Sequence, residues 1–428
     1  MNEDLLHYMW KYQRVNRSMQ TTDGKPIFVE NPGWHNTDAG PDFFNAKVRI
    51  GNTLWAGNIE IHLKSSDWFL HRHNVDKAFD NIILHIVFEE DKSVFDKNGN
   101  KIPTIELKNI IDPDLIVNYK TFLNNKNPIP CSNLLKNVDN FVIFNWLEKL
   151  AVERLQDKTD YILSKLELNK NDWEQAFYEI FARNFGFKLN AEPFELLAKS
   201  LPQQYFAKSK NNLFQIEALL FGQAGMLEEN FQDDYPNRLK AEYDYNRKKY
   251  KLKPIQKHLW KFLRIRPSNF PTIRIAQFAN LIYKSDSLFS KLIECQNVKQ
   301  LSALLHTECS NYWLDHYIFD KTSRRSKKQL HISSINLLII NTIIPFIFTY
   351  GKSRDDYKFT EKALELLSGL PPEKNHITEK FCKAGIEPKN AMQSQSMIQL
   401  YTGYCCNKKC LQCSIGAAIL NDKKDFSG

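Results

Sequence analysis

The sequence lacks the features that define several classes of protein. Glycine and proline are few, at 15 and 17 of 428 residues, which excludes collagen-like and low-complexity chains. No unit of 20 to 50 residues repeats along the chain, so a solenoid is not supported. The N-terminus begins Met1-Asn2-Glu3-Asp4, which is acidic, and it lacks the cationic start and unbroken apolar run of an export signal. We therefore expect a cytoplasmic protein.

Long apolar segments are also missing. The most apolar one, residues 335–350, is interrupted by Asn336, Asn341 and Pro345 and is shorter than the roughly 20 residues that span a bilayer. We predict that it forms a buried helix ending near Pro345 and that the protein has no membrane partner. The sequence leaves the oligomeric state open.

The composition that is present indicates a folded, mildly basic protein. Hydrophobic residues make up 43% of the chain and aromatic residues 13%, and 58 Lys and Arg oppose 49 Asp and Glu. The charge is uneven, because residues 1–100 hold 11 basic and 14 acidic side chains whereas residues 238–274 hold 12 basic and two acidic ones. An acidic region and a cationic region in one chain are typical of a carboxylate site that acts on a polyanion.

The residue patterns predict an α+β protein. In the first part, residues 3–15 have helical spacing, and residues 43–50 and 54–63 read as strands joined by a tight turn at Gly51-Asn52. Residues 81–88 and 102–107 are further strands, with a helix or irregular linker between 68 and 80. From about residue 141 the apolar spacing is helical. We expect an α/β domain at 1–125, a helical basic domain at 126–375 and a cysteine-containing segment at 376–428 that packs back on the protein.

Four polar residues of the predicted hairpin form the candidate active site. Alternate side chains on a strand share a face, so Glu60, His62 and Lys64 point the same way, and Asp42 begins the preceding strand. Asp42 at the start of the preceding strand should lie level with the polar end of its partner, about opposite Lys64, unless a bulge intervenes. Asp42 and Glu60 would share Mg²⁺ or Mn²⁺, while His62 or Lys64 assists the attacking water. The alternative is that these residues form one solvated face of the sheet.

The order of these elements resembles the core of the PD-(D/E)XK nuclease superfamily over residues 1–110. The resemblance implies that Asp42 and Glu60 bind the metal ion, and Glu3 on the first helix is an additional candidate ligand. His62 stands where the superfamily has lysine, with Lys64 two residues further along, which leaves the catalytic cation open and allows an inactive relative. Phrases such as NPGWHNTDAGPDFFNA and YCCNKKCLQCSIG resemble, over most of the chain, a bacterial family of domains of unknown function (number 2851).

A second polar cluster follows the hairpin. Imidazole and carboxylate groups suit Zn, Mn or Fe, and a zinc-dependent hydrolase built on His71 and His73 is an alternative function. These residues could equally form a structural network or contact a phosphate. We expect His85, which lies in an apolar run, to be a core histidine. The cluster comprises Ser66, Asp67, His71, His73 and Asp76.

A basic stretch in the helical region suits nucleic acid, because cations neutralise phosphates and the interleaved aromatic rings can stack on bases. A solvated basic face over a helical core is the alternative. The candidate nucleic-acid-binding residues are Lys248, Lys249, Lys257, Lys261, Arg264, Arg266 and Arg274.

The C-terminal cysteines have metal-ligand spacing. Cys406, Cys410 and Cys413 can supply three thiolates, and the fourth ligand would be Cys131, Cys382 or Cys405. Some nucleases of the resembled superfamily hold an iron–sulfur cluster between one upstream cysteine and three near the C-terminus, an arrangement that Cys131 would complete. Zinc, an iron–sulfur cluster and unligated thiols all remain open.

Taken together, the residues predict a metal-dependent, nuclease-like protein that hydrolyses phosphodiester bonds in nucleic acid, with DNA expected ahead of RNA. The competing hypothesis is a nucleic-acid-binding or scaffold protein that keeps the fold without the reaction. It predicts salt-sensitive binding and no turnover.

Overall fold

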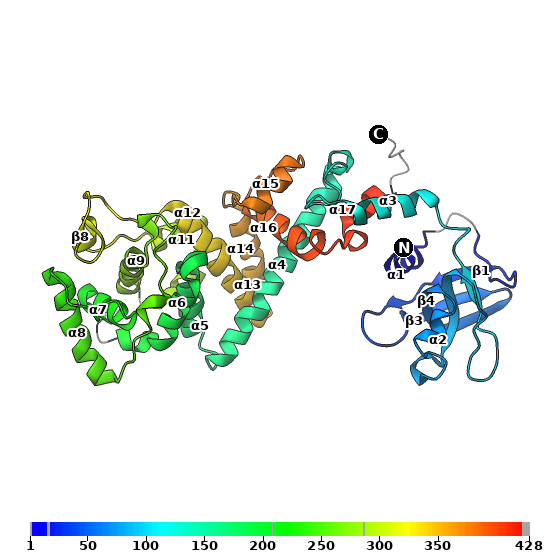
Figure 1. Ribbon diagram of the computed structural model, residues 1–428, viewed down its shortest axis with the longest axis horizontal. Coiled ribbons are helices and arrows are strands. Elements are labelled where there is room, and N and C mark those ends of the chain that lie inside the picture. Colours follow the sequence, from blue (N-terminus) through cyan, green and yellow to red (C-terminus); the bar gives the residue numbers. More distant parts are fainter. Residues whose placement is uncertain (1, 15–17, 208, 210, 286, 422–428) are drawn as a thin grey trace. The chain divides into compact units, whose positions relative to one another are not determined.

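The chain forms two compact units in the computed structural model, which describes all residues except 1, 15–17, 208, 210, 286 and 422–428 (Figure 1). Unit 1 comprises Met1–Trp146, Lys383–Ile386 and Leu400–Gly428, and unit 2 comprises Leu147–Cys382 and Glu387–Gln399. Unit 1 is therefore assembled from both ends of the sequence. The predicted α+β class is confirmed, because a mixed sheet in the N-terminal region precedes a series of helices.

Unit 1 is built on a mixed sheet in the order β1-β3-β4-β5-β6, with the short β2 paired to β3. Neighbours from β1 to β4 are antiparallel, whereas β4, β5 and β6 run parallel. The strands are β1 Ile27–Asn31, β2 Trp34–His35, β3 Phe43–Ile50, β4 Thr53–Lys64, β5 Ile82–Glu89 and β6 Thr104–Glu106. The helices are α1 Glu3–Lys11, α2 Asp67–Leu70 and α3 Pro113–Asn124.

The predicted hairpin is present, with Ile50 opposite Thr53 and Gly51 at φ 57°, a left-handed conformation that glycine adopts at little cost. The expected strands near 81–88 and 102–107 are β5 and β6. The first helix is shorter than expected, since α1 ends at Lys11, and its predicted end at Val15 lies outside the described residues. Strands β1 and β2 were not predicted, because residues 31–41 are rich in turn formers.

A bulge in β3 changes the expected register. Ala46 pairs with Gly57, but Phe43 pairs with Ile59, and Asn45 between them has φ 55°. An extra residue in one strand of a pair shifts all later partners. Asp42, which precedes Phe43, lies beside Glu60 and Ile61, so the expected position opposite Lys64 is wrong. Regular pairing outward from Ile50 and Thr53 leads to Ile61, and the bulge shifts the register by one residue toward Glu60.

The face of β4 that carries Glu60 and His62 is not exposed to solvent, contrary to the alternative of a solvated face. Ile59, Glu60, Ile61 and His62 are all buried, so both faces of the strand are covered. β5 lies parallel to β4, with Glu60 beside His85, and the connection between them passes through α2. A parallel pair requires such a crossover, which brings the α2 region back to the sheet.

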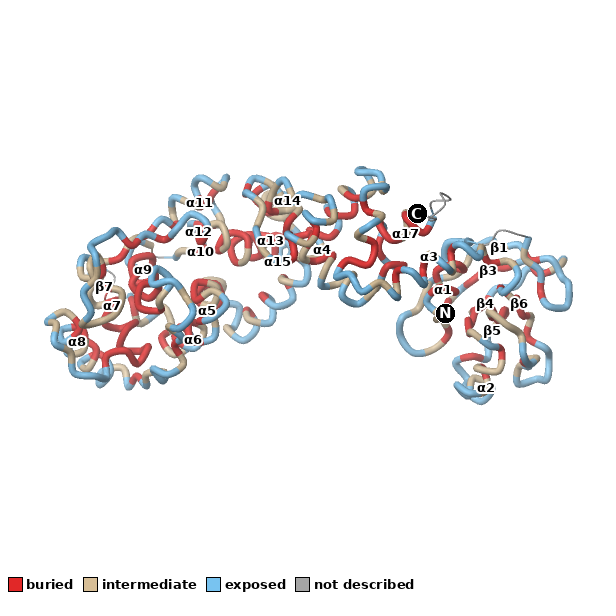
Figure 2. The backbone as a smooth tube through the Cα atoms, turned by 45° about the horizontal axis from the view of Figure 1, so that its top comes forward, coloured by how far each residue is buried: buried red, intermediate tan, exposed pale blue. Residues whose placement is uncertain are grey.

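Unit 2 is helical around one hydrophobic core. In Figure 2 the buried residues of α9 appear as a red segment, in agreement with continuous burial from Pro271 to Leu281. The helix α4, Asn140–Leu168, begins in unit 1 and continues into unit 2. The next helices are α5 Trp173–Phe185, α6 Phe187–Ser200, α7 Leu213–Gln223, α8 Asp234–Tyr250, α9 Pro271–Lys284, α10 Leu288–Glu294 and α11 Val298–Leu305. They are followed by the strands β7 His316–Ile318 and β8 Lys321–Thr322, and by α12 Ile332–Leu338, α13 Ile344–Ser353, α14 Tyr357–Ser368, α15 His376–Lys383 and α16 Ala391–Gln399.

The apolar segment does not end at Pro345 as expected. A π-helical turn, Ile339–Ile343, joins α12 to α13, and the helix continues to Ser353. Proline removes one helical hydrogen bond, and the carbonyl of Asn341, four residues earlier, accepts the side-chain N–H of Asn184 at 3.3 Å instead. Residues Ile332–Ser353 are long and apolar enough to cross a membrane, but 67% of their most apolar window is buried in the protein, as in a core helix.

Candidate metal centre

Two carboxylates from neighbouring strands interlock at the bulge. The backbone N–H of Asp42 donates to Glu60 Oε2 at 3.2 Å, and the backbone N–H of Ile61 donates to Asp42 Oδ2 at 2.9 Å. Each side chain is therefore held by the opposite strand, which fixes its rotamer. The predicted convergence of Asp42 and Glu60 is what the structure shows, although the bulge produces it and not the expected register.

The other oxygen of Glu60 faces histidines. Oε1 lies 3.2 Å from His73 Nε2 and 3.6 Å from His62 Nε2, and the Glu60 side chain is only 6% exposed. Among the described residues His73 Nε2 has no aligned hydrogen-bond partner, so its N–H is not directed at Glu60 Oε1 despite the short separation. Both atoms can therefore be bound by a third partner.

Three histidines bring their ligand atoms together beside Glu60. One nitrogen each from His62, His71 and His73 lies within 4.8 Å of the others. His62 Nε2 is 3.1 Å from His71 Nδ1, and His62 Nδ1 is 2.8 Å from His85 Nε2. His85 is buried as predicted, but it is also the group that orients the His62 ring.

The separations fit the edges of a coordination shell. Metal–ligand bonds of about 2.1 Å place two ligand atoms about 3.0 Å apart at a right angle and about 3.4 Å apart at a tetrahedral angle. The distances from His62 to His71 (3.1 Å), from His73 to Glu60 (3.2 Å) and from His62 to Glu60 (3.6 Å) lie near this range. The three imidazoles could hold one divalent ion, and Glu60, which contacts two of them, is a further candidate ligand.

The histidines after β4 are positioned by their turn. Arg72 has φ 61°, and His71 and His73 on either side of it have ring centroids 5.5 Å apart. His73 also stacks on Phe79 at 3.7 Å, which fixes its ring. A left-handed non-glycine residue costs on the order of 1 kcal/mol and is often found at functional sites.

The remaining members of the predicted second cluster hold the loop and do not face the histidines. Ser66 Oγ donates to Asp91 at 2.8 Å, and Asp67 accepts the backbone N–H of Lys64 at 2.9 Å. Asp76 caps the short helix Lys77–Phe79 through the N–H of Ala78 at 2.9 Å. Of that cluster, the structure brings only His71 and His73 to the centre.

Helix α1 adds two groups that lie beside Asp42. His7 Nε2 is 3.3 Å from Asp42 Oδ2. The sequence does not predict this contact, because the spacing of residues 7 and 42 does not relate a helix to a strand. Glu3, the additional candidate ligand, lies near enough for the charge of Asp42 to act on it. Lys64 lies at the exposed end of β4, while His62, the other candidate cation, is buried in the centre.

Burial sets the protonation of the group. It lowers the pKa of His62 to about 2 and that of His85 to about 3, with the neighbouring histidines adding to the effect. Both rings are thus neutral near pH 7 and keep a lone pair for a metal or a hydrogen bond. Burial also raises the pKa of Glu60, and the charge of Asp42 adds to this, whereas contact with His73 opposes it. A cation would offset this cost.

The basic residues of unit 2 are mostly at the surface. Lys248, Lys249, Lys257, Lys261, Arg264 and Arg266 are exposed. Arg274 is buried, and its guanidinium donates to Asn269 at 2.6 Å and Gln277 at 3.1 Å. It stabilises the interior and does not belong to the exposed basic surface, because the helix α9 that carries it is buried along almost its whole length.

The cysteines predicted as metal ligands differ in how far they are buried. Cys406 is exposed, whereas Cys131, Cys410 and Cys413 are buried and Cys405 is half-buried beside them. Cys382 is exposed and belongs to unit 2. Cys405, the alternate candidate, is therefore more enclosed than Cys406, and the binding of a metal by these cysteines stays a prediction.

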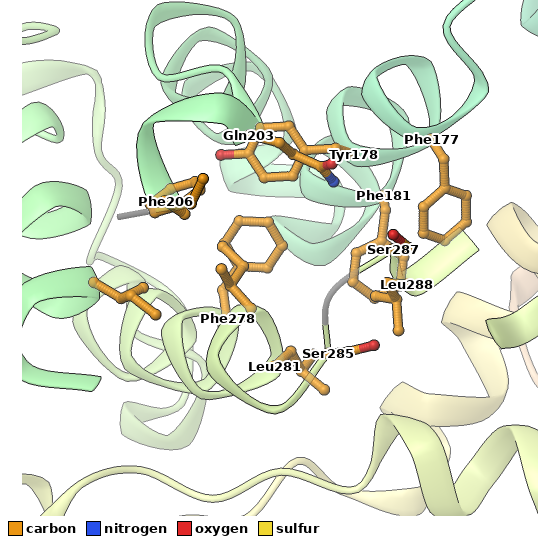
Figure 3. A pocket seen from close by; sticks show the side chains of 13 residues that line it. Phe177, Tyr178, Phe181, Gln203, Phe206, Phe278, Leu281, Ser285, Ser287 and Leu288 are labelled. Carbon is orange, nitrogen blue, oxygen red and sulfur yellow. The ribbon is translucent and has the colours of Figure 1, made fainter. Parts of the chain in front are cut away.

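A cavity of about 190 Å³ in unit 2 contains none of the predicted site residues. Figure 3 shows aromatic rings lining it, among them Phe177, Tyr178, Phe206 and Phe278, with Gln203 as a polar group. It offers no cluster of ionisable ligands, so the candidate centre of unit 1 is the chemically richer site.

Comparison with known proteins identifies a family. The family described as "Protein of unknown function (DUF2851)" matches residues 3–376. Searches of curated proteins and of solved structures gave no match. Because the family match covers most of the sequence, the chain belongs to the DUF2851 family.

Proposed function

We propose that unit 1 is a divalent-metal-dependent hydrolase that cleaves phosphodiester bonds in nucleic acid, with DNA as the first substrate to test. The observation that carries the proposal is the group of His62, His71 and His73, whose ligand nitrogens lie within 4.8 Å of one another. Glu60 Oε1 lies 3.2 Å from His73 and 3.6 Å from His62, and a second carboxylate, Asp42, lies beside Glu60. Hard oxygen and imidazole ligands together suit Mn²⁺, which also replaces Mg²⁺ in many phosphoryl sites.

The order of elements supports the same reaction class. An acid at the start of one strand and a Glu-x-His sequence on the next, followed by a crossover to a parallel strand, resembles the PD-(D/E)XK arrangement. Fold likeness is only an analogy, so the function is argued from the side chains.

In this proposal each residue of the centre has a distinct role. Glu60 Oε1, His62 Nε2, His71 Nδ1 and His73 Nε2 hold the ion, and His85 fixes the His62 ring. Such an ion polarises a phosphodiester and lowers the pKa of bound water. Asp42, paired with His7, places a proton acceptor beside that water.

The exposed cations of residues 248–266 support a polyanionic substrate. Lysine and arginine neutralise phosphates whatever the base sequence, so they would bind nucleic acid without reading it. In this proposal unit 2 contributes affinity and unit 1 contributes the reaction.

The test is cleavage of single- and double-stranded DNA, and of RNA, by the purified full chain with Mn²⁺, Mg²⁺ or Zn²⁺. Glu60→Gln and Asp42→Asn should each lower the rate by about 100-fold or more, as expected for groups that hold charge at the reacting centre. Glu30→Gln, on the exposed edge strand β1, is the matched control and should leave the rate unchanged. Cleavage that persists unchanged in both site variants would contradict the proposal.

A second candidate, a zinc hydrolase, is favoured by the three-histidine group. It predicts activity restored best by Zn²⁺ and lost in His71→Ala, but insensitive to Glu60→Gln. Salt-sensitive binding of DNA with no turnover under any metal would instead support the non-catalytic alternative.

A further inference from the structure

Unit 2 contains an aromatic cavity that has no part in the proposed reaction. Its volume is about 190 Å³, and its walls come mainly from α5, α7, α9, α10 and the 3-10 turn Gln203–Phe206. All of these elements belong to the segment Leu147–Cys382, so the cavity lies within one compact unit. Its chemistry can therefore be argued without reference to the histidine centre of unit 1.

The inner part of the cavity is lined by aromatic rings that are more widely spaced than stacked rings elsewhere in unit 2. The ring of Phe278 is nearly parallel to those of Tyr178 and Phe181, at centroid distances of 5.8 and 6.2 Å. The stacked rings of Tyr235 and Tyr312 are 4.4 Å apart. The wider spacing leaves parts of the ring surfaces facing the cavity, where they can contact another aromatic ring (Figure 3).

This aromatic part is buried, and its tyrosine hydroxyl is already bonded. Phe177, Tyr178 and Phe278 are only 1%, 3% and 2% exposed. The Tyr178 hydroxyl donates to the carbonyl of Leu201 at 3.1 Å, so this residue presents its ring to the cavity and not a free O–H group. Cavities with such walls favour apolar molecules over water.

The side chain of Gln203 supplies a polar group on the cavity wall. Figure 3 shows it among the lining residues, and it is half-buried. Its backbone N–H donates to Gln175 Oε1 at 3.2 Å, which holds the start of the 3-10 turn against α5. Its side-chain amide forms no hydrogen bond within the described part of the chain. Because an amide offers both donors and an acceptor, it can bind a hydroxyl or amide group of a ligand.

The cavity also extends to the protein surface. Ala207 and Ser287, which line it, are exposed, and Ser285 and Leu288 are half-buried. A small molecule can therefore reach the aromatic rings from solvent.

The walls and the volume define the kind of molecule that fits. None of the described lining residues is charged, and burying an ionised group without a partner costs far more than burying a neutral one. An apolar cavity of about 150 Å³ holds a benzene ring. With about 190 Å³, this cavity has room for one ring and a short substituent.

We propose that this cavity binds a small neutral molecule made of one aromatic ring and a short substituent that ends in a hydroxyl or amide group. The ring lies against Tyr178, Phe181 and Phe278, and the substituent is bonded by the Gln203 amide. This binding site goes beyond the hydrolase function and does not depend on it, because every lining residue belongs to unit 2.

The first experiment adds benzyl alcohol to the full chain and follows binding by saturation-transfer NMR and by thermal unfolding. We expect saturable binding with a Kd of about 1 mM or tighter, and a rise in Tm, as for a ligand of few atoms in a preformed cavity. Benzoate has the same ring but an ionised carboxylate, and it should bind at least about 10-fold more weakly. No saturable binding of benzyl alcohol up to about 10 mM would overturn the proposal. Equal binding of benzoate would contradict a neutral ligand.

The second experiment tests the polar group with a matched pair of variants. Gln203→Leu should bind benzyl alcohol about 5-fold more weakly than the wild type and toluene no more weakly, because only benzyl alcohol can use the amide. Gln204→Leu, at an exposed position of the same turn that does not line the cavity, should keep the wild-type preference for benzyl alcohol. Loss of that preference in both variants, or in neither, would contradict the role of Gln203.

The third experiment locates the site by obstructing its entrance. Ala207→Phe places a ring at an exposed lining position, so the variant should fold and should bind benzyl alcohol and toluene at least about 10-fold more weakly. Leu288→Trp, at a half-buried lining position, is a second obstruction in case the first variant does not fold. Cooperative thermal unfolding without ligand shows which variants are folded. Unchanged binding of both probes in a folded variant would place the ligand elsewhere and overturn the assignment to this cavity.

Discussion

A half-buried glutamate of unit 2 and a buried glutamate of unit 1 are stabilised in different ways. Glu195 of unit 2, with a side chain 12% exposed, contacts Lys165 Nζ at 2.7 Å, Arg183 at 2.6 Å and Lys199 Nζ at 2.7 Å. Although burial opposes ionisation, hydrogen bonds from Lys165, Lys199 and Arg183 lower the pKa of Glu195 to about 2. Glu60 of unit 1 is 6% exposed and faces His62 and His73, and burial raises its pKa.

The difference separates a structural carboxylate from a candidate ligand. Three protein cations already neutralise Glu195, so it needs no further partner. Glu60 is held in place by the backbone of Asp42, but among the described residues no lysine or arginine forms an ion pair with it. A buried acid that is oriented but not neutralised is the arrangement expected where a cation binds.

The largest effect is expected from removing the charge of Glu195. Glu195→Gln leaves three cations around a neutral amide and should lower the free energy of unfolding by about 3 kcal/mol near pH 7, the equivalent of the pKa shift. Glu192→Gln, at an exposed position of the same helix, is the control and should change it by less than about 0.5 kcal/mol. Urea denaturation measures both. If Glu192→Gln lowered the free energy of unfolding by a similar amount, the ion pairs of Glu195 would not be the cause of the effect.

The pH dependence follows from the same shift. Because the pKa of Glu195 is lower in the folded protein than its ordinary value of 4.5, its stabilisation is complete above pH 4.5 and disappears as the pH falls toward about 2. The stability difference between the wild type and Glu195→Gln should therefore shrink across that window. A difference that stays constant would show that the ion pairs are not its source.

Metal should stabilise the wild type and not the Glu60 variant. A ligand at 100 times its Kd stabilises the folded state by about 2.7 kcal/mol, which thermal unfolding with added Mn²⁺ would detect as a rise in Tm. Glu60→Gln should abolish the rise, and Glu195→Gln, although less stable, should keep it. A rise of equal size in both variants would place the ion elsewhere.

Without metal, Glu60→Gln should not lower stability at neutral pH. The pKa of Glu60 is raised on folding, so its charged form is disfavoured and the wild type loses stability as the pH rises above 4.5. The neutral amide removes this cost. Chelator-treated protein, unfolded with urea at pH 5 and pH 7.5, tests the sign, and a variant that is less stable at pH 7.5 would contradict it.

The smallest effect is expected from removing exposed lysines that do not neutralise an enclosed carboxylate. Lys248 and Lys249 are exposed, whereas Lys165 is half-buried and contacts Glu195. Each alanine substitution at 248 or 249 should weaken DNA binding several-fold and reduce the slope of log K against log[salt] by about one. Lys352→Ala, exposed in unit 2 outside the basic stretch, should leave the slope unchanged.

Much of the fold was predictable because the strands of unit 1 carry strong local patterns. The Gly51-Asn52 turn fixes its hairpin, and the apolar run of β5 can only be a buried strand. The bulge at Asn45 was not predictable, because asparagine adopts φ 55° only where the neighbouring contacts require it. That one conformation decides whether Asp42 meets Glu60 or a later residue of β4.

The site was predictable to the extent that its residues lie near one another in sequence. Glu60, His62, His71 and His73 fall within one short stretch, and Asp42 begins the preceding strand. His7 reaches Asp42 from α1, and no periodicity relates a helix to a strand so far along the chain. Arg274 was wrongly assigned to the nucleic-acid-binding surface. Its neighbours in the sequence are exposed cations, but Arg274 itself lies on α9, which is a core helix.

The division of the chain has a consequence for its synthesis. Unit 1 is interrupted by unit 2 in the sequence, so its N-terminal sheet emerges from the ribosome long before the C-terminal segment that contacts α1 and α3. Domains generally fold as units during translation, and unit 2 can reach its native state first. A nascent chain stopped before Leu400 would therefore carry a complete helical unit and a unit 1 whose α1 and α3 lack the contacts of the last segment, which leaves those helices open to proteases and chaperones until it arrives.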